Sequence, residues 1–397
     1  DEVAATREAL GWDLAPFEVP SDVLAAWREA GARGGEDHKA WLARHAATDA
    51  PIRADFDAAV AGDLPADLDD AVAAHVKGLI DEPPVWATRK ASQEALEVIT
   101  ARVPEMIGGS ADLTGSNNTQ TKVEDVLSAD NYAGRFIHYG VREHAMAAAM
   151  NGLALHGGVI PYSGTFLVFT DYCRPSIRLS ALMGIRVIYV MTHDSIGLGE
   201  DGPTHQPIEH LMSLRAMPNL NVFRPADAVE TAECWALALA HKDRPSVIAL
   251  TRQGVPAVRT EAMGRNLSAD GAYVLAAAPS GTAAVSLLAT GSEVALALSA
   301  RETLLADGIE TQVVSMPCWE LFDQKPAAER DAVLGPQAVR VAVEAGAAFG
   351  WERYVGPAGG VVGLSRFGES APAKDVYQDL GITADAVVAK AKECLGR

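Results

Sequence analysis

Residues 186–207 read RVIYVM and then THDSIGLGEDGPTHQP, an apolar run followed by a long polar loop. The apolar run is short and rich in β-branched and aromatic residues, and it predicts a buried β-strand. The loop after it holds two histidines, three acids and three glycines before a proline that is suited to begin a helix. A buried strand that opens into such a loop is typical of a parallel α/β sheet, whose ligands bind beyond the carboxyl ends of the strands.

The same alternation of apolar runs and helical stretches continues on both sides of this stretch. Strands are predicted at 105–108, 135–139, 159–162, 186–191, 220–223 and 246–251, with helices at 143–156, 165–183, 208–215 and 228–241. This alternation favours a parallel sheet that helices cover on both faces. A smaller α/β segment follows, with strands at 283–289, 311–315, 339–344 and 361–364 and helices at 291–307 and 384–395.

The chain of 397 residues is too long for one ordinary core, and its composition changes at two places. Residues 1–78 are helical in pattern and acidic, with no strand signal, and Pro83-Pro84 marks a break after them. A polar stretch at 260–270 is typical of a linker. We therefore expect a helical segment at 1–78, a larger α/β domain at 79–262 and a smaller α/β domain at 263–397.

The composition excludes several classes of protein. The formal net charge is −19, which argues against a nucleic-acid partner, because binding phosphates along a strand needs clustered Lys and Arg. No apolar stretch is long enough to predict a membrane span. The four cysteines form no C-x-x-C pair, which favours unpaired thiols in a reducing cytoplasm. The first residues, DEV, lack both a secretory signal and a starting Met, which suggests a fragment or processed product.

Several residues are candidates for chemistry, and each has a simpler structural interpretation. Glu143 is expected at a helix start, where the helix dipole favours any acid, yet a carboxylate at a strand end can also serve in proton transfer. Phe166, Phe169 and Tyr172 are spaced as one helix face, which favours a core stripe over an aromatic wall for a cofactor ring. His193 and His205 lie twelve residues apart with no further ligand pattern, so no metal site is predicted.

Three further residues suggest an anion site. Arg89, Ser116 and Arg252 are expected near strand ends or helix starts, and each alone is more often a solvated surface residue. Together they would form a phosphate pocket, because guanidinium groups bind phosphate through two parallel hydrogen bonds. Asp112 also follows a predicted strand and belongs to the same edge of the sheet.

Taken together, these motifs closely resemble those of the transketolase family, in family order and over essentially the whole chain. The matching segments are LGWDLAPFEVP (10–20), GGSADL (108–113), YGVREHAM (139–146), GTFLVFTDY (164–172), THDSIGLGEDGPTHQ (192–206), FRPAD (223–227), ALTRQ (249–253), ATGSE (289–293) and RFGES (366–370). The resemblance implies a transferase that uses thiamine diphosphate and Mg²⁺ or Ca²⁺ to move two-carbon units between sugar phosphates in the pentose phosphate pathway. Its donor would be xylulose 5-phosphate and its acceptor ribose 5-phosphate. The cofactor carries the hard chemistry in such enzymes.

The resemblance also implies a role for each candidate residue. Glu143 looks like the glutamate that hydrogen-bonds the aminopyrimidine ring, Phe166, Phe169 and Tyr172 look like the pocket around that ring, and Asp112 matches an acid beside it. His193 and Asp201 resemble contacts to substrate hydroxyls, and His205 resembles a proton-transfer group at the reacting centre. Arg89, Ser116, His193 and Arg252 resemble the acceptor phosphate site.

One departure from the family's pattern shapes the expected assembly. The Gly-Asp-Gly…Asn type motif that holds the diphosphate and metal in the family is not found, so we expect the chain to lack most of the family's N-terminal diphosphate-binding domain. The metal ligands would then lie outside this chain, and the isolated chain would be incomplete as an enzyme. The family builds its site between two subunits, which implies a homodimer. A non-catalytic module or half-enzyme, a dihydroxyacetone synthase and a deoxyxylulose-phosphate synthase stay open as alternatives.

Overall fold

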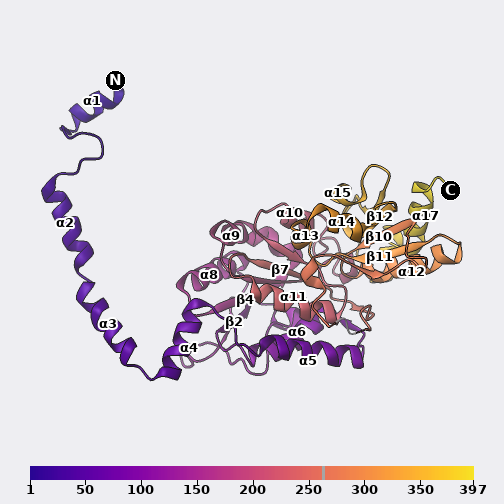
Figure 1. The fold of residues 1–397 in the computed structure, drawn as a ribbon, viewed down its shortest axis with the longest axis horizontal. Coiled ribbons are helices and arrows are strands. Elements are labelled where there is room, and N and C mark those ends of the chain that lie inside the picture. Colours follow the sequence, from indigo (N-terminus) through magenta and orange to yellow (C-terminus); the bar gives the residue numbers. More distant parts are fainter. Residues whose placement is uncertain (262–263) are drawn as a thin grey trace. The chain divides into compact units, whose positions relative to one another are not determined.

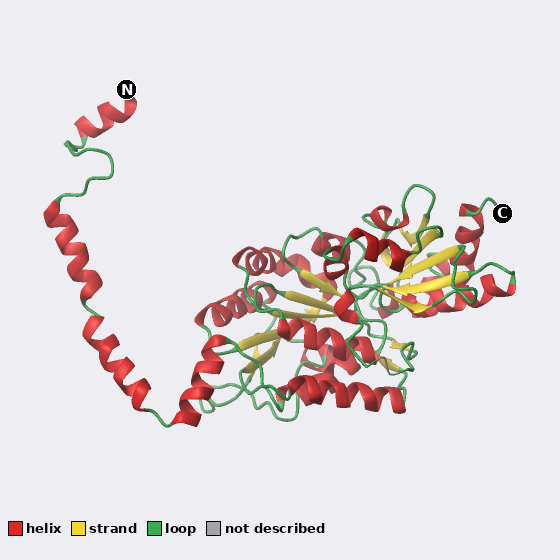
Figure 2. Cartoon of the chain, viewed as in Figure 1, coloured by secondary structure: helices red, strands yellow, loops and turns green. Residues whose placement is uncertain are grey.

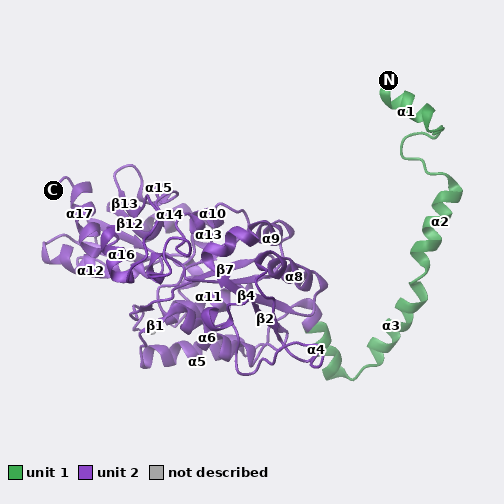
Figure 3. Cartoon of the chain, turned by 180° about the vertical axis from the view of Figure 1, so that it is seen from behind, with its two compact units in different colours: residues 1–58 green, residues 59–397 purple. Residues whose placement is uncertain are grey.

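The computed structural model describes residues 1–261 and 264–397 and contains two compact units, residues 1–58 and residues 59–397 (Figure 3). The predicted boundary between residues 262 and 263 lies outside the described residues. In the part of the chain that is described, no helix is both long and apolar enough to cross a bilayer.

The first unit is entirely helical. Its helices are α1 (Glu2–Ala9), α2 (Ser21–Ala32), α3 (Gly35–Ala47) and the start of α4 (Ala50–Ala61) (Figure 1). None of these four helices contains a buried residue. Since most helical stability in proteins comes from packing an apolar face, these helices gain little from their own unit.

The second unit contains a six-stranded parallel sheet in the order β3-β2-β4-β5-β7-β6. The strands are β2 (Met106–Ser110), β3 (Phe136–His138), β4 (Ile160–Phe166), β5 (Ile188–Thr192), β6 (Asn221–Phe223) and β7 (Ser246–Leu250). Helices α5 (Leu68–Asp81), α6 (Thr88–Thr100) and α11 (Ala228–Ala240) pack together, and α8 (Glu143–His156) packs on α9 (Thr170–Met183), with α10 (His210–Arg215) beside β6 (Figure 2).

Strand β5 shows why this sheet needs helices on both faces. Ile188 and Val190 belong to the core that holds Leu96 and Trp235, from α6 and α11. Tyr189 and Met191 belong to a separate core with α8 and α9. Successive side chains of a strand point to opposite faces, so the apolar run of β5 is buried on both.

A second sheet of five strands has the order β13-β12-β10-β11-β9. Its strands are β9 (Tyr273–Ala276), β10 (Val285–Ala289), β11 (Thr311–Ser315), β12 (Val339–Ala347) and β13 (Gly360–Leu364). Its helices are α12 (Glu293–Ala306), α13 (Trp319–Asp323), α14 (Ala327–Leu334), α15 (Glu352–Val355), α16 (Ala373–Asp379) and α17 (Ala384–Cys394). All neighbouring strands are parallel except β9, which runs antiparallel to β11. The predicted α/β fold class with a helical N-terminal segment is therefore confirmed.

Smaller elements complete the second unit. The short strands β1 (Trp86–Ala87) and β8 (Gly254–Val255) form an antiparallel ribbon, and α7 (Thr114–Asn117) follows β2. Short 3₁₀ helices lie at Leu167–Phe169, Ile196–Leu198 and Ser268–Asp270. All four cysteines are free, and three of them are buried, as expected for unpaired thiols.

Candidate functional site

The candidate residues gather at the carboxyl edge of the six-stranded sheet. Asp112 follows β2, Phe166 is the last residue of β4, His193 follows β5 and Arg252 follows β7. The four strands lie in the order β2-β4-β5-β7 and are parallel, so their carboxyl ends meet along one edge. The sheet therefore brings together residues that are up to 140 positions apart in sequence.

A cleft of about 530 Å³ opens at this edge. Its lining residues are Ala111, Asp112, Leu113, Val141, Glu143, Phe169 and Tyr172. Glu143 is the first residue of α8 and is only 8% exposed. Its carboxylate makes no hydrogen bond or ion pair with any described residue, and its oxygens are not among the fully buried unpartnered atoms, so they are accessible from the cleft.

The aromatic residues do not form the single helix face that their spacing predicts. Phe166 ends β4, Phe169 ends a 3₁₀ turn, and Tyr172 lies in the first turn of α9. The rings still stack in series, with centroids 5.6 Å apart between Phe166 and Phe169 and 5.8 Å apart between Phe169 and Tyr172. Chain reversal from strand to helix, not helical periodicity, creates this aromatic wall.

Two histidines of the 192–206 loop pack against this wall. The His193 ring is stacked on Phe166 at a centroid distance of 3.6 Å, and His205 meets Phe166 and Phe169 edge-on at 6.1 and 5.4 Å. His193 has a positive φ of 60°, which is uncommon for a residue other than glycine, although histidine adopts it more often than most. Burial lowers the pKa of His193 to about 3, with further lowering by Arg89, Arg252 and His205. The ring is therefore neutral at physiological pH.

Two guanidinium groups lie near His193 without a carboxylate partner. Arg89 donates from Nη1 to the Ser116 carbonyl at 2.8 Å, and Arg252 donates from Nη1 to the Leu198 carbonyl at 3.3 Å. Burial lowers the pKa of Arg89, and the neighbouring charge of Arg252 lowers it further. No acid among the described residues forms an ion pair with either arginine, so these two cations are available to an anionic ligand.

Asp201 is the candidate residue that the structure does not join to the others. It is exposed on the turn between Gly199 and Gly202. No hydrogen bond or ion pair of the described residues connects its side chain with the remaining candidates. The Ser116 hydroxyl likewise has no hydrogen bond to a described candidate residue, and only its main-chain carbonyl contacts Arg89.

The residues that hold the 192–206 loop in place were not predicted from the sequence. Asn117 and Thr192 connect Ser110 to the His193 ring through buried hydrogen bonds. Arg224 donates to Asp194, next to His193, at 2.9 Å. Only the FRPAD segment contained a signal for Arg224, since an arginine directly after a buried strand is unlikely to face bulk apolar core without a partner.

The far side of the loop packs against the segment after β13. Gln206 donates from Nε2 to the Glu369 carbonyl at 3.0 Å, and Ser370 donates from Oγ to the Glu200 carbonyl at 2.5 Å. A Cβ atom at Gly368 would lie 1.7 Å from Gln206 Oε1, so a larger residue there requires the buried Gln206 side chain to move. The candidate site is thus supported by both sheets of the second unit.

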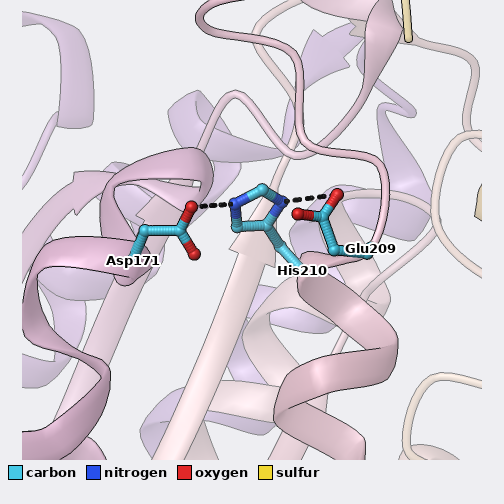
Figure 4. A group of neighbouring side chains, drawn as sticks. All are labelled: Asp171, Glu209 and His210. Carbon is cyan, nitrogen blue, oxygen red and sulfur yellow. Dashed lines mark ion pairs between the residues drawn. The ribbon is translucent and has the colours of Figure 1, made fainter.

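An acidic pair flanks His210 near the start of α9 (Figure 4). His210 Nε2 lies 3.2 Å from Asp171 Oδ2, and Nδ1 lies 3.9 Å from Glu209 Oε2. One possible ligand atom from each of the three side chains lies within 4.8 Å of the other two, and no ion is present among them. The group connects the start of α9 to the start of α10.

Three family models match consecutive parts of the chain. The model described as "Transketolase, thiamine diphosphate binding domain" matches residues 1–65, that of the pyrimidine binding domain matches 85–257, and that of the "Transketolase-like TK C-terminal domain" matches 271–383. The first match corrects the expectation that the chain lacks most of the family's diphosphate-binding domain, because residues 1–65 match the model of that domain. The LGWDLAPFEVP segment at 10–20 already related these residues to the helical end of that domain.

Known proteins that the chain resembles are transketolases. Transketolase from Cereibacter sphaeroides is 56% identical over 99% of this chain, and the chain spans 59% of that protein's length. A solved transketolase from Pichia stipitis, in complex with xylulose 5-phosphate, is 37% identical to this chain with a TM-score of 0.89. The match covers 98% of this chain and 57% of the Pichia chain. A split-gene transketolase, solved as an inactive β4 tetramer, is 27% identical with a TM-score of 0.65 and is matched over 99% of its length and 78% of this chain.

These matches agree with the motifs at the sheet edge and with the order of the two sheets. Transketolase models cover both sheets and the helical segment before them. The chain therefore belongs to the transketolase family.

Proposed function

We propose that this chain carries the pyrimidine-binding and substrate-binding half of a transketolase site. The reaction is the transfer of a two-carbon ketol unit from a ketose phosphate, such as xylulose 5-phosphate, to an aldose phosphate, such as ribose 5-phosphate. The observation that carries the proposal is the buried carboxylate of Glu143, which has no protein partner and lines a cleft beside Phe169 and Tyr172. Beside this cleft, two arginines without acidic partners provide a site for phosphate.

The family implies thiamine diphosphate and a divalent metal, and the cleft suits the aminopyrimidine end of that cofactor. A flat ring can stack on the exposed Tyr172 and on Phe169, while an acid at the end of the cleft accepts a hydrogen bond from a ring nitrogen. When bound, the cofactor supplies the nucleophilic carbon that accepts and donates the two-carbon unit. Whether the metal is Mg²⁺ or Ca²⁺ stays a prediction, and we assign none of the residues of this chain to it.

On the cofactor side, residues of this chain would bind and orient the aminopyrimidine ring. Glu143 holds a proton at the ring nitrogen, and its low exposure strengthens that hydrogen bond, because the surrounding dielectric is low. Phe166, Phe169 and Tyr172 orient the ring and exclude water from one face. Asp112, at the opposite wall of the cleft with a positive φ of 63°, is a second polar contact.

On the substrate side, charge complementarity supports the assignment. The charges of Arg89 and Arg252 repel each other. A phosphate bound between them relieves that repulsion and accepts a charge-assisted hydrogen bond from each arginine. This pocket is positive within a chain of net charge −19, so it selects anions locally. His193, Asp201 and His205 are assigned to the sugar hydroxyls and the reacting centre, with Ser116 beside Arg89.

We also propose a homodimer and a cytoplasmic location. A half-enzyme that needs a separate diphosphate-binding partner is a second candidate, and the match to a split-gene transketolase over 99% of that chain favours it. Similarity to transketolases does not decide between transketolase and dihydroxyacetone synthase activity, so substrate choice is tested directly.

The test is a coupled two-carbon transfer assay with xylulose 5-phosphate, ribose 5-phosphate, thiamine diphosphate and magnesium. It uses the chain alone and the chain mixed with a separately produced diphosphate-binding domain of a transketolase. Activity in either arm that is lost in Arg252→Ala, but retained in Arg265→Ala at a solvated ion pair with Asp270, supports the proposal. Activity only in the mixture identifies a half-enzyme, and no transfer in either arm overturns the transketolase assignment.

A further inference from the structure

A chain of four buried polar groups leads from the β2 strand to His193. Leu113 N–H donates to Ser110 Oγ at 3.0 Å, and Ser110 Oγ donates to Asn117 Oδ1 at 3.0 Å. Asn117 Nδ2 donates to Thr192 Oγ1 at 2.7 Å, and Thr192 Oγ1 lies 2.9 Å from His193 Nδ1. Ser110, Asn117 and Thr192 have no exposed surface, so water does not substitute for any of these partners.

The direction of these hydrogen bonds follows from the Ser110 hydroxyl. Its oxygen already accepts from the Leu113 amide, so its hydrogen needs an acceptor, and Asn117 Oδ1 is the acceptor in reach. The Asn117 amide nitrogen must then face Thr192 and donate to it. The opposite amide orientation would leave the buried Ser110 hydroxyl hydrogen without an acceptor, which is unfavourable because a buried donor without a partner loses its hydrogen bonds to water and gains none.

Once Thr192 Oγ1 accepts from Asn117, its own hydrogen is free to donate to His193 Nδ1. A neutral imidazole that accepts at Nδ1 carries its proton at Nε2. Within the described residues, Nε2 makes no hydrogen bond, and the ring lies against Phe166 at the mouth of the loop.

We infer that Asn117 and Thr192 are positioning residues that fix the tautomer of His193, so that its Nε2–H is presented as a hydrogen-bond donor to a sugar oxygen. The use of that donor rests on the proposed function, whereas the tautomer itself does not. Gly164 supports the arrangement, because a Cβ atom there would lie 3.0 Å from the Cβ of Asn117 and would displace it.

The direct test is the protonation of each ring nitrogen, measured by ¹⁵N NMR on the chain labelled at histidine, with His193→Asn used to assign the signals. The wild-type chain and Thr192→Ser are expected to show Nδ1 unprotonated and Nε2 protonated. Thr192→Val removes the donor and is expected to give a mixture of tautomers, while Thr100→Val, which removes another buried threonine hydroxyl, leaves His193 unchanged. A wild-type ring with its proton at Nδ1, or a Val variant with an unchanged ring, overturns the inference.

A second variant keeps the test decisive if Thr192→Val does not fold. Asn117→Asp replaces the amide donor with a carboxylate, so Thr192 must donate to it and accept from the ring. The proton of His193 is then expected at Nδ1, the reverse of the wild type, and an unreversed tautomer counts against the relay.

The catalytic readout separates this inference from the proposed function. In the reconstituted transfer assay, Thr192→Val is expected to lower kcat/KM by about three- to tenfold, the effect of one weakened hydrogen bond, and Thr192→Ser is expected to restore it. Absence of transfer in every variant would reject the proposed function alone, because the NMR result does not depend on turnover. A changed tautomer with unchanged kcat/KM would reject the donor role of His193.

Discussion

Single side chains at the sheet edge have their properties set by neighbours from other strands. His193 is the clearest case, since burial and the charges of Arg89, Arg252 and His205 together lower its pKa to about 3. We expect its ring resonances to stay constant between about pH 5 and pH 8 in an NMR titration. Replacing both Arg89 and Arg252 by Gln removes two like charges and should raise the pKa, though burial should keep it below the ordinary value. A ring that titrates near neutral pH in the wild type would contradict the described environment.

The role of Glu143 is also a property of one side chain. Because its carboxylate has no partner among the described residues, Glu143→Gln should leave the melting temperature nearly unchanged. In the reconstituted assay the same change should lower kcat by about 10²–10⁴-fold, the usual range for a lost proton-transfer group. Glu209→Gln, at an exposed acid of the same sheet edge, serves as the control. An equal loss of kcat in Glu143→Gln and Glu209→Gln would mean that the loss does not come from the Glu143 carboxylate in the cleft.

At the scale of elements, helix α5 offers a test of local propensity. Gly78 lies inside this helix with no positive φ, and nothing lies within 4 Å of the place where a Cβ would be. Gly78→Ala should therefore raise the free energy of unfolding by about 0.5–1 kcal/mol in denaturant titrations. Gly134→Ala is the opposite case, because its Cβ would lie 2.4 Å from the Val126 backbone and should destabilise the chain. If Gly78→Ala instead lowered the free energy of unfolding, the added methyl group would be in contact with a part of the protein outside the described residues, which contradicts the open space described here.

Elements also show what the sequence could and could not predict. Helix α8 begins and ends where predicted, at Glu143 and His156, and strand β11 matches 311–315, because periodicity and flanking turns agree there. The helix predicted at 165–183 begins only at Thr170, since β4 extends through Phe166. Strand β9 was missed because its pairing to β11 is antiparallel and distant in sequence. The buried relay through Asn117 was also missed, because the hydrogen bond from Asn117 of α7 to Thr192 of β5 joins residues far apart in sequence and leaves no local pattern.

For the whole second unit, a buried charge network joins the two sheets. Glu344 of β12 receives two hydrogen bonds from Arg215 of α10, at 2.8 and 3.0 Å, and Arg224 lies 3.6 Å away. Burial alone would raise the pKa of Glu344, but the two guanidinium groups hold it at about 2. Because the folded pKa is below the unfolded value, this carboxylate stabilises the fold above about pH 4.5, and that contribution is lost as the pH falls toward about 2.

This network predicts how the free energy of unfolding and its pH dependence change when Glu344 loses its charge. Glu344→Gln leaves Arg215 without its charge partner and should cost about 3–5 kcal/mol of unfolding free energy near neutral pH. Its stability should also depend less on pH between about pH 5 and pH 3 than that of the wild type. Asp331→Asn breaks an exposed pair with Arg340 and should change stability by less than about 1 kcal/mol. An acid-unfolding curve that is the same in Glu344→Gln and wild type would mean that other carboxylates govern it.

The contact between the 192–206 loop and residues 368–370 has a consequence for how such a protein can change. Selection experiments that vary only the residues lining a pocket leave unchanged the residues behind them that hold the lining in position. Here a larger residue at Gly368 must displace the Gln206 side chain, and loss of the Ser370 hydroxyl removes a hydrogen bond to the Glu200 carbonyl, without altering any group that faces the cleft. We therefore expect libraries built at these distal positions to change sugar preference through the loop.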